Sequence, residues 1–163
     1  NMALALSHDV LHGMKNFRVV VQPVVSTQTG KIVGGEMLLR WRFRDRDVSP
    51  DVFVTMLEKD NMINIVGRWV FEQAVCTCMR LVSYSPDFYL TFNVSLQQMT
   101  DETFPDYMEE VLSKYKVAGS RLAAEMTASC IERPRRFRQL LFVLSHAASI
   151  SDEHREAGSL AAR

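Results

Sequence analysis

The residues best suited to chemistry are polar side chains inside strands that are otherwise apolar. Glu36 and Arg40 lie in one such run and share a face with Leu38, because successive side chains of a strand alternate between its two faces. The opposite face carries only apolar side chains: Met37, Leu39 and Trp41. We therefore predict a strand buried on both sides, whose polar face lines a cavity or forms a pair.

Two more polar residues follow in later apolar segments. Asn93 lies near the end of the aromatic segment 88–95, although asparagine is a poor strand former. Two interpretations stay open for it: a residue that ends the strand in a turn, or an amide oxygen offered to a metal or ligand. Glu125 lies among apolar residues in the segment 121–127 and, taken alone, could be an outward surface charge.

The elements that must position these residues alternate along the chain. Two apolar, β-branched runs within 17–43, joined by Ser-Thr-Gln-Thr-Gly, predict a β-hairpin. Helices are predicted from Pro50 to about residue 60, over 64–82 and after a cap at 100–102, with strands at 88–95 and 121–127. This alternation predicts parallel strands joined by crossover helices.

Three local features sharpen the prediction. Ser49 and Pro50 indicate a helix start, with the serine hydroxyl as cap and the proline in the first turn. The preceding segment, 42–48, mixes charges of both signs and is predicted to be a solvated loop. In the helix 64–82 the near-periodic apolar residues are Ile65, Trp69, Val75, Cys78, Met79 and Val82.

The composition is typical of a globular protein of one domain, with 163 residues of which 47% are hydrophobic. The 19 basic residues balance the 19 acidic ones, so no overall field would draw the chain to a nucleic acid polymer or an anionic membrane. No apolar run approaches the roughly 20 residues of a membrane span, and three cysteines do not make a disulfide framework. We therefore expect a cytoplasmic protein.

Several short motifs, in the right order, resemble those of the EAL family, the bacterial cyclic-di-GMP phosphodiesterase domains. After Gln22-Pro23, the family's Glu-Ala-Leu corresponds to Glu36-Met37-Leu38 within Gly35–Trp41. Asn93-Val94-Ser95 is similar to the family's Asn-x-Ser. Glu125–Ala128 is similar to its Glu-x-Thr-Glu, with the last acid replaced by Ala128. Ser49-Pro50 and Gly67–Val70 also fall where the family has counterparts.

The resemblance implies an α/β fold, namely the N-terminal half of an EAL-type (β/α)8 (TIM-like) barrel, incomplete and opening with an antiparallel hairpin. It implies a site at the C-terminal ends of the strands, with Glu36, Asn93 and Glu125 as metal ligands. Such hard oxygen donors suit Mg²⁺ or Mn²⁺, which activate water and neutralise charge on a phosphodiester. The substrate-binding residues that it implies are Gln22, Leu38 and Arg40, the arginine on a phosphate oxygen.

The expected organisation is a linker helix at 1–16, a partial EAL domain at 17–130 and a divergent, helical tail at 131–163. In the linker helix, His8 and His12 have a spacing that can clamp a metal, but without a third ligand nearby a solvated helix face is favoured. The family continues with an Asp-Asp-Phe-Gly strand end and a lysine-bearing strand, whereas 131–163 contain no Asp-Asp pair and no lysine. A truncation or frame disruption near Cys130 is our hypothesis for this difference.

By family, the expected function is hydrolysis of cyclic-di-GMP to the linear dinucleotide, in signal transduction. The truncated copy is expected to be catalytically impaired, with no complete catalytic set, because the second half of the site is missing. The alternative is a degenerate EAL module that binds cyclic-di-GMP or a protein partner without catalysis. Expected partners are cyclic-di-GMP and either a second copy of the chain or an upstream sensory or regulatory domain.

Overall fold

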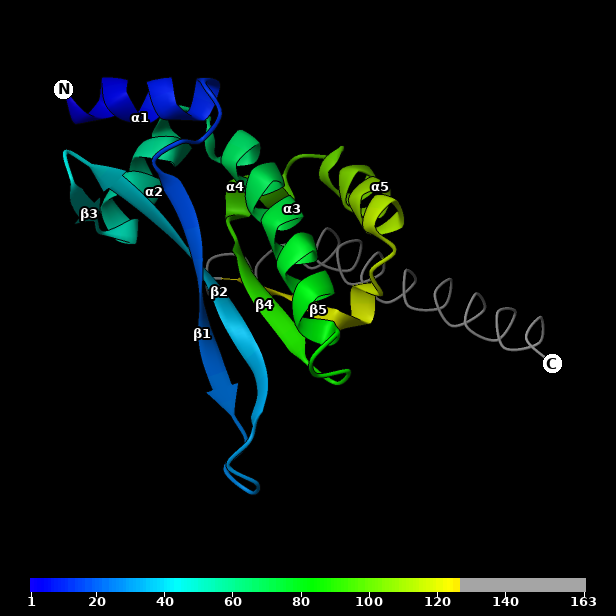
Figure 1. The fold of residues 1–163 in the computed structure, drawn as a ribbon. Helices are drawn as coiled ribbons and strands as arrows, with labels where there is room; N and C mark the ends of the chain where they lie inside the picture. The colour runs from blue at the N-terminus through cyan, green and yellow to red at the C-terminus, as the bar shows by residue number, and fades with distance from the viewer. Residues whose placement is uncertain (127–163) are drawn as a thin grey trace.

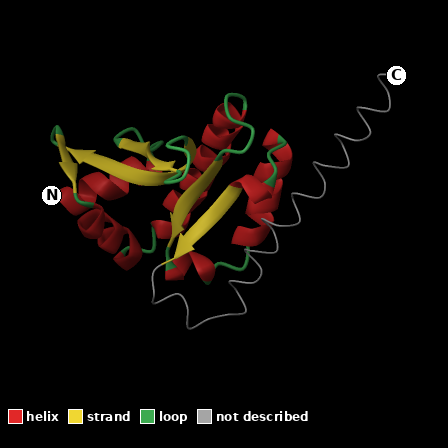
Figure 2. Cartoon of the chain, turned by 90° about the horizontal axis from the view of Figure 1, so that it is seen from below, coloured by secondary structure: helices red, strands yellow, loops and turns green. Residues whose placement is uncertain are grey.

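The computed structural model describes residues 1–126, in which helices and strands alternate (Figures 1 and 2). The predicted tail and the expected break near Cys130 lie outside the described residues. The strands are β1 (Phe17–Val25), β2 (Ile32–Phe43), β3 (Arg46–Val48), β4 (Tyr89–Val94) and β5 (Leu122–Met126). The helices are α1 (Met2–Leu11), α2 (Pro50–Lys59), α3 (Ile63–Val82), α4 (Leu96–Met99) and α5 (Phe104–Tyr115), with a 3₁₀ turn at Gly119–Arg121.

The strands form one mixed sheet in the order β1-β2-β4-β5, with β3 paired to β2. Strands β1 and β2 make the predicted antiparallel hairpin, whose tip projects beyond the rest of the described chain (Figure 1). Strand β4 runs parallel to β2, and β5 runs parallel to β4. Because α2 and α3 connect β3 to β4 and α5 connects β4 to β5, the predicted parallel strands with crossover helices are confirmed.

The helices pack on one face of the sheet and enclose the core there. Trp41 of β2 and Phe92 of β4 are buried on this face, at 0% and 1% exposure. Phe71 of α3 meets the Phe92 ring edge-on, with 5.4 Å between ring centroids, and also contacts Phe104 of α5. Helix α3 lies against β4, and α5 lies beyond it (Figure 1). The face of the sheet that carries the polar residues is therefore the one opposite the helices.

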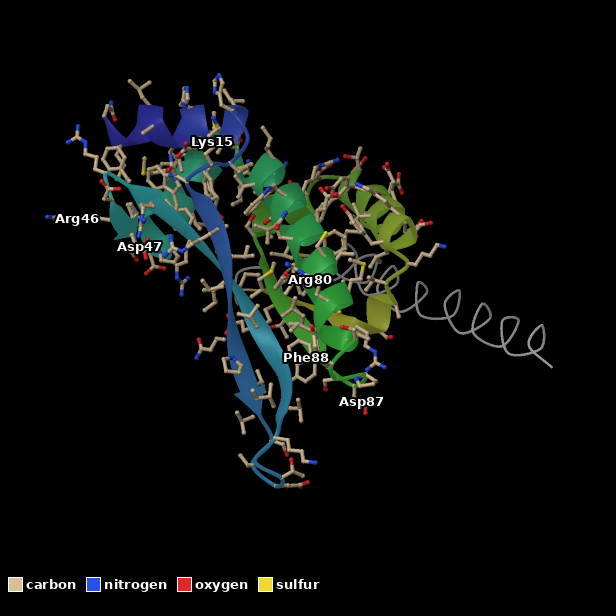
Figure 3. The ribbon with its side chains drawn as sticks, in the orientation of Figure 1. Lys15, Arg46, Asp47, Arg80, Asp87 and Phe88 are labelled. Atoms are coloured by element: carbon tan, nitrogen blue, oxygen red, sulfur yellow. The ribbon has the colours of Figure 1, made fainter. Side chains whose placement is uncertain are left out.

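The segment predicted to be a solvated loop contains a strand that the sequence does not signal. Residues Arg46–Val48 form β3 and pair with β2, so that Val48 lies opposite Trp41. The turn between them has positive φ at both Arg44 and Asp45, 48° and 60°. Tight hairpin turns of this kind usually carry asparagine or glycine, which explains why the prediction failed. In Figure 3, Arg46 points away from the body of the protein.

Helix α3 begins one residue before its predicted start and ends where predicted, but part of its predicted buried stripe is wrong. Ile65 and Met79 are each 46% exposed, whereas Val75 and Cys78 are buried as expected. The full buried set is Ile63, Val66, Gly67, Val70, Phe71, Ala74, Val75 and Cys78. This set follows the helical repeat on the side that faces β4 and α5. Apolar residues lie on more than one side of α3, so the periodicity of the sequence alone did not identify the side of the helix that is buried.

Two helix starts differ from the prediction. Pro50 is the first residue of α2 as expected, but the Ser49 side chain makes no capping hydrogen bond. Instead, the Ser49 backbone carbonyl accepts from the N–H groups of Val52 and Phe53. The short helix α4 was not predicted, and the next helix, α5, begins only at Phe104.

Helix α1 is fastened to the sheet. Its Leu6 and Val10 are buried in the common core, at 1% and 5% exposure. Trp41 Nε1 donates a hydrogen bond of 2.9 Å to the carboxylate of Asp9. The domain boundaries expected at 16 and 130 remain predictions. Within residues 1–126, no helix combines the length and the apolar character that a membrane crossing requires.

Candidate functional site

Three strands bring the three predicted metal ligands to one face of the sheet. Glu36 lies directly opposite Thr91 in the β2–β4 ladder, and Asn93 lies directly opposite Glu125 in the β4–β5 ladder. Residues directly opposite each other share a face, as do residues two apart in a strand. Glu36, Asn93 and Glu125 therefore project from neighbouring strands on the side away from the helices.

The position of each residue along its strand also bears on the site. Asn93 and Glu125 are the last residues but one of β4 and β5, so both lie at the C-terminal ends of parallel strands. Glu36 lies within β2, which continues past the sheet core into its pairing with β3. Of the two interpretations of Asn93, the turn is excluded, because Asn93 is still paired within the strand.

The side chains of Glu36 and Asn93 are in direct contact. Asn93 Nδ2 donates a hydrogen bond of 3.2 Å to Glu36 Oε1, across 57 positions of sequence. Glu36 is half-buried, while Asn93 and Glu125 are exposed. Glu36 therefore forms a pair as predicted, and its partner is the Asn93 amide of the next strand in the sheet.

The prediction that this strand is buried on both sides is wrong in the described part of the chain. Glu36, Leu38 and Arg40 are all half-buried, whereas Met37 and Trp41 on the opposite face are buried. The physical reason is that, within residues 1–126, the helices pack against the face that carries Met37 and Trp41.

The predicted substrate-binding residues lie on the same face. Gln22 of β1 is directly opposite Glu36, and it is exposed. Leu38 and Arg40 follow Glu36 at intervals of two along β2. Arg40 Nη1 donates to the Leu39 carbonyl at 2.9 Å, so its guanidinium is folded back on its own strand. All six predicted site residues therefore share one face.

The donor set is compatible with a hard divalent cation. Among residues 1–126, no group of three or more His, Cys, Asp or Glu side chains is close enough to hold a metal, and the set proposed here has two carboxylates and one amide. A half-turn of the Asn93 amide exchanges its NH₂ group and its oxygen, so this side chain can offer Oδ1 beside the Glu36 carboxylate. Two carboxylates and an amide oxygen are ligands that Mg²⁺ and Mn²⁺ accept.

Two features of this region were not recognised in the sequence. Thr91 Oγ1 lies between Glu36 and Ala123 in the ladders, and this atom is buried without a hydrogen-bond partner in the described part of the chain. Ser95, predicted only as part of a motif, caps α4 through its side chain. The Ser95-x-x-Gln98 spacing is a capping-box pattern and could have signalled this helix.

A separate cavity of about 410 Å³ lies between α1 and the β2–β3 turn. Asp9, Asn16 and Arg42 contribute to its wall, and none of the six predicted site residues does. His8 also lines it, but His8 and His12 stack on each other with ring centroids 4.1 Å apart.

Comparison with known proteins identifies a family. The family model described as EAL domain matches residues 5–150. A cyclic di-GMP phosphodiesterase of Pseudomonas aeruginosa is 31% identical over 120 residues, which are 73% of this chain and 20% of that protein. A probable cyclic di-GMP phosphodiesterase of Escherichia coli is 28% identical over 134 residues, 78% of this chain and 17% of that protein. The chain thus spans about a fifth of the length of such curated relatives.

Solved structures show the same fold. The MucR phosphodiesterase in complex with c-di-GMP has a TM-score of 0.74 and 23% identity, covering 91% of this chain and 60% of that one. The Xanthomonas citri FimX EAL domain in complex with c-diGMP has a TM-score of 0.74 and 22% identity, covering 90% and 57%. The expected fold class, part of an EAL-type barrel with an opening hairpin, is confirmed.

Proposed function

The chain belongs to the EAL domain family, and from this we propose that the polar face of β2, β4 and β5 is the N-terminal half of a site for cyclic-di-GMP. The observation that carries the proposal is the contact of Glu36 with Asn93, beside Glu125. Three oxygen-bearing side chains on three adjacent strands face away from the core, where they gain nothing from packing. A ligand is a sufficient reason for this arrangement.

Glu36, Asn93 and Glu125 would hold Mg²⁺ or Mn²⁺. When bound, such an ion neutralises charge on a phosphodiester and lowers the pKa of a water molecule. The role of the protein residues is to fix the position of the donors. The hydrogen bond from Asn93 to Glu36 shows that the two side chains are adjacent, and a half-turn of the amide would present Oδ1 to the ion. The buried Thr91 hydroxyl opposite Glu36 is a further group that could donate to this carboxylate.

Gln22, Leu38 and Arg40 would contact the dinucleotide. Arg40 is half-buried beside Leu38, and it donates a hydrogen bond to the Leu39 carbonyl. To reach a phosphate oxygen it would give up this one backbone bond, and a guanidinium binds phosphate through two parallel N–H groups. Leu38 offers apolar contact and Gln22 an amide on the facing strand. These residues lie along β1 and β2, across the sheet from Glu125.

Binding without hydrolysis is the second candidate. It is favoured by the sequence of 131–163, which contains neither the Asp-Asp pair nor the lysine that the resemblance implies for the second half of the site. In this candidate, Glu36, Asn93 and Arg40 hold the nucleotide as a receptor does. A cytoplasmic location, and a second copy or an upstream sensory domain as partner, belong to both candidates.

The test is calorimetric titration of the full 163-residue chain with cyclic-di-GMP, with and without Mn²⁺, followed by chromatography of the nucleotide. Heat that depends on Mn²⁺, with the nucleotide intact, would support the receptor, and linear dinucleotide would support the phosphodiesterase. Asn93→Ala should abolish the heat of binding that depends on Mn²⁺. Glu109→Ala, on the exposed side of α5, should leave this heat unchanged. No heat from a folded sample would refute both candidates.

A further inference from the structure

The backbone that follows Asn93 is held by a reciprocal cap. Helix α4 begins two residues after the strand that carries Asn93. Gln98 N–H donates to Ser95 Oγ at 3.3 Å, and Ser95 N–H donates to Gln98 Oε1 at 3.0 Å. These two bonds close a ring around the first turn of α4, and so fix the direction in which the chain leaves β4.

Helix α3 holds the Gln98 side chain in place. Gln98 is polar yet only 4% exposed, and it packs against Gly67. A Cβ at position 67 would overlap the end of the Gln98 side chain, both its Nε2 and its Cδ. The absence of a side chain on Gly67 is therefore what lets the Gln98 amide lie between α3 and the end of β4.

The rest of the connection is anchored to the same part of the fold. Gln97 Nε2 donates to Asn61 Oδ1 at 2.8 Å, which ties α4 to the turn before α3. Beyond α4, Arg68 Nη2 donates to Asp101 Oδ2 at 2.9 Å. The Arg68 carbonyl also accepts from the Tyr107 hydroxyl at 3.2 Å. The segment from Asn93 to α5 is therefore attached to α3 at successive points, on the core side of the sheet.

We propose that Gln98 is a positioning residue for Asn93. Asn93 is exposed, and it lies only two residues before Ser95. Whether its amide meets Glu36 at 3.2 Å depends on the path of the last residues of β4. The Gly67–Gln98–Ser95 arrangement sets that path from the side of the sheet opposite the ligand. The link to metal affinity rests on the proposed function, whereas the effect on the Asn93 side chain does not.

The first measurement follows the Asn93 side-chain amide in a ¹H–¹⁵N correlation spectrum of the full chain, with the signal assigned by its loss in Asn93→Asp. Gln98→Ala should displace or broaden this signal. The matched control is Gln97→Ala, which removes an adjacent α4 side chain and its bond to Asn61 but leaves the cap intact. An equal change in both variants would overturn the proposal. In Gln98→Glu the carboxylate can still accept the hydrogen bond from the Ser95 N–H, as glutamate does in a capping box. The Asn93 signal of this variant should therefore resemble that of the wild type.

The second measurement is Mn²⁺ affinity, from the relaxation enhancement of water protons. Removing a group that orients a metal ligand typically lowers affinity by about 10-fold or more, so Gln98→Ala should lose at least that much and Gln97→Ala much less. If Gln98→Ala displaces the Asn93 amide signal but keeps the wild-type affinity for Mn²⁺, the proposed effect of Gln98 on metal binding is overturned. If the wild-type chain binds no Mn²⁺, the proposed function fails, and the amide signal still decides the positioning role.

A variant that fails to fold would not end the test. Gln98→Asn keeps the amide but is one methylene shorter, so it removes the reach to Ser95 with little change in polarity. The expected result is a folded chain with a displaced Asn93 signal. An Asn93 signal identical to that of the wild type in this variant would overturn the proposal.

Discussion

Trp41 and Asp9 are joined by a hydrogen bond of 2.9 Å that links helix α1 to the strand carrying Glu36. The same carboxylate accepts from Asn16 Nδ2 through both of its oxygens, at 2.8 and 2.9 Å. Asp9 is 7% exposed and Trp41 is fully buried. Helix α1 thus contributes to the common core, and it contacts the strand that carries Glu36.

Replacing Asp9 should destabilise the fold strongly. In Asp9→Ala the indole N–H of Trp41 stays buried without an acceptor, and hydrogen bonds to charged groups contribute about 1.5–3 kcal/mol each. We expect the free energy of unfolding, measured in urea, to fall by about 2–3 kcal/mol. The control is Asp87→Ala, whose side chain is fully exposed at 3.8 Å from Arg121. Equal losses in the two variants would contradict the role given to Asp9.

The orientation of α3 can be tested with one pair of variants. Phe71 is fully buried between Phe92 and Phe104, whereas Met79 is 46% exposed. Phe71→Ala should lower the free energy of unfolding by about 3–5 kcal/mol, through lost burial and the cavity left behind. Met79→Ala should change it by only about 0.5 kcal/mol. Chemical denaturation of both variants measures these losses. If the buried side predicted from the sequence were correct, Met79→Ala would lose more stability than Phe71→Ala.

Glu72 should make stability depend on pH in the acid range. The Tyr115 hydroxyl and the Lys114 ammonium donate to its Oε1 at 2.8 and 3.0 Å, and these bonds hold the pKa of Glu72 below its ordinary 4.5. A depressed carboxyl pKa in the folded state stabilises the fold above the unfolded value, and this contribution is lost as pH falls through the folded pKa.

Glu72→Gln should therefore be less stable than wild type at neutral pH, and the difference should shrink below pH 4.5. Urea denaturation over a pH series measures this difference directly. Tyr115→Phe removes the hydrogen bond that lowers the pKa of Glu72 most. In that background, the stability difference caused by Glu72→Gln should therefore vary less with pH. A difference that is constant across the series would refute the pairing.

The two cysteines of α3 should react at very different rates. Cys78 is fully buried, and burial raises the pKa of its thiol to about 11, while Cys76 is half-buried. Because the thiolate is the reactive form, iodoacetamide at mildly alkaline pH should modify Cys76 and leave Cys78 intact. Peptide mass spectrometry in a Cys130→Ser background measures both sites. Modification of Cys78 without denaturant would show that α3 opens or is placed otherwise.

Local patterns of the sequence determined on which elements the proposed site residues lie. The alternation along β2 placed Glu36, Leu38 and Arg40 on one face, because side-chain direction in a strand repeats every two residues. The hairpin, the parallel strands and the order of the main helices followed from similar short-range signals.

Only the tertiary structure decided what these residues meet. That Asn93 reaches Glu36 depends on the register between β2 and β4, which neither strand's own sequence pattern specifies. The same is true of the buried side of α3 and of Gln98 against Gly67, because burial is a property of the assembled layers. Strand β3 also depends on its partner, since Arg46–Val48 becomes a strand only by pairing with β2.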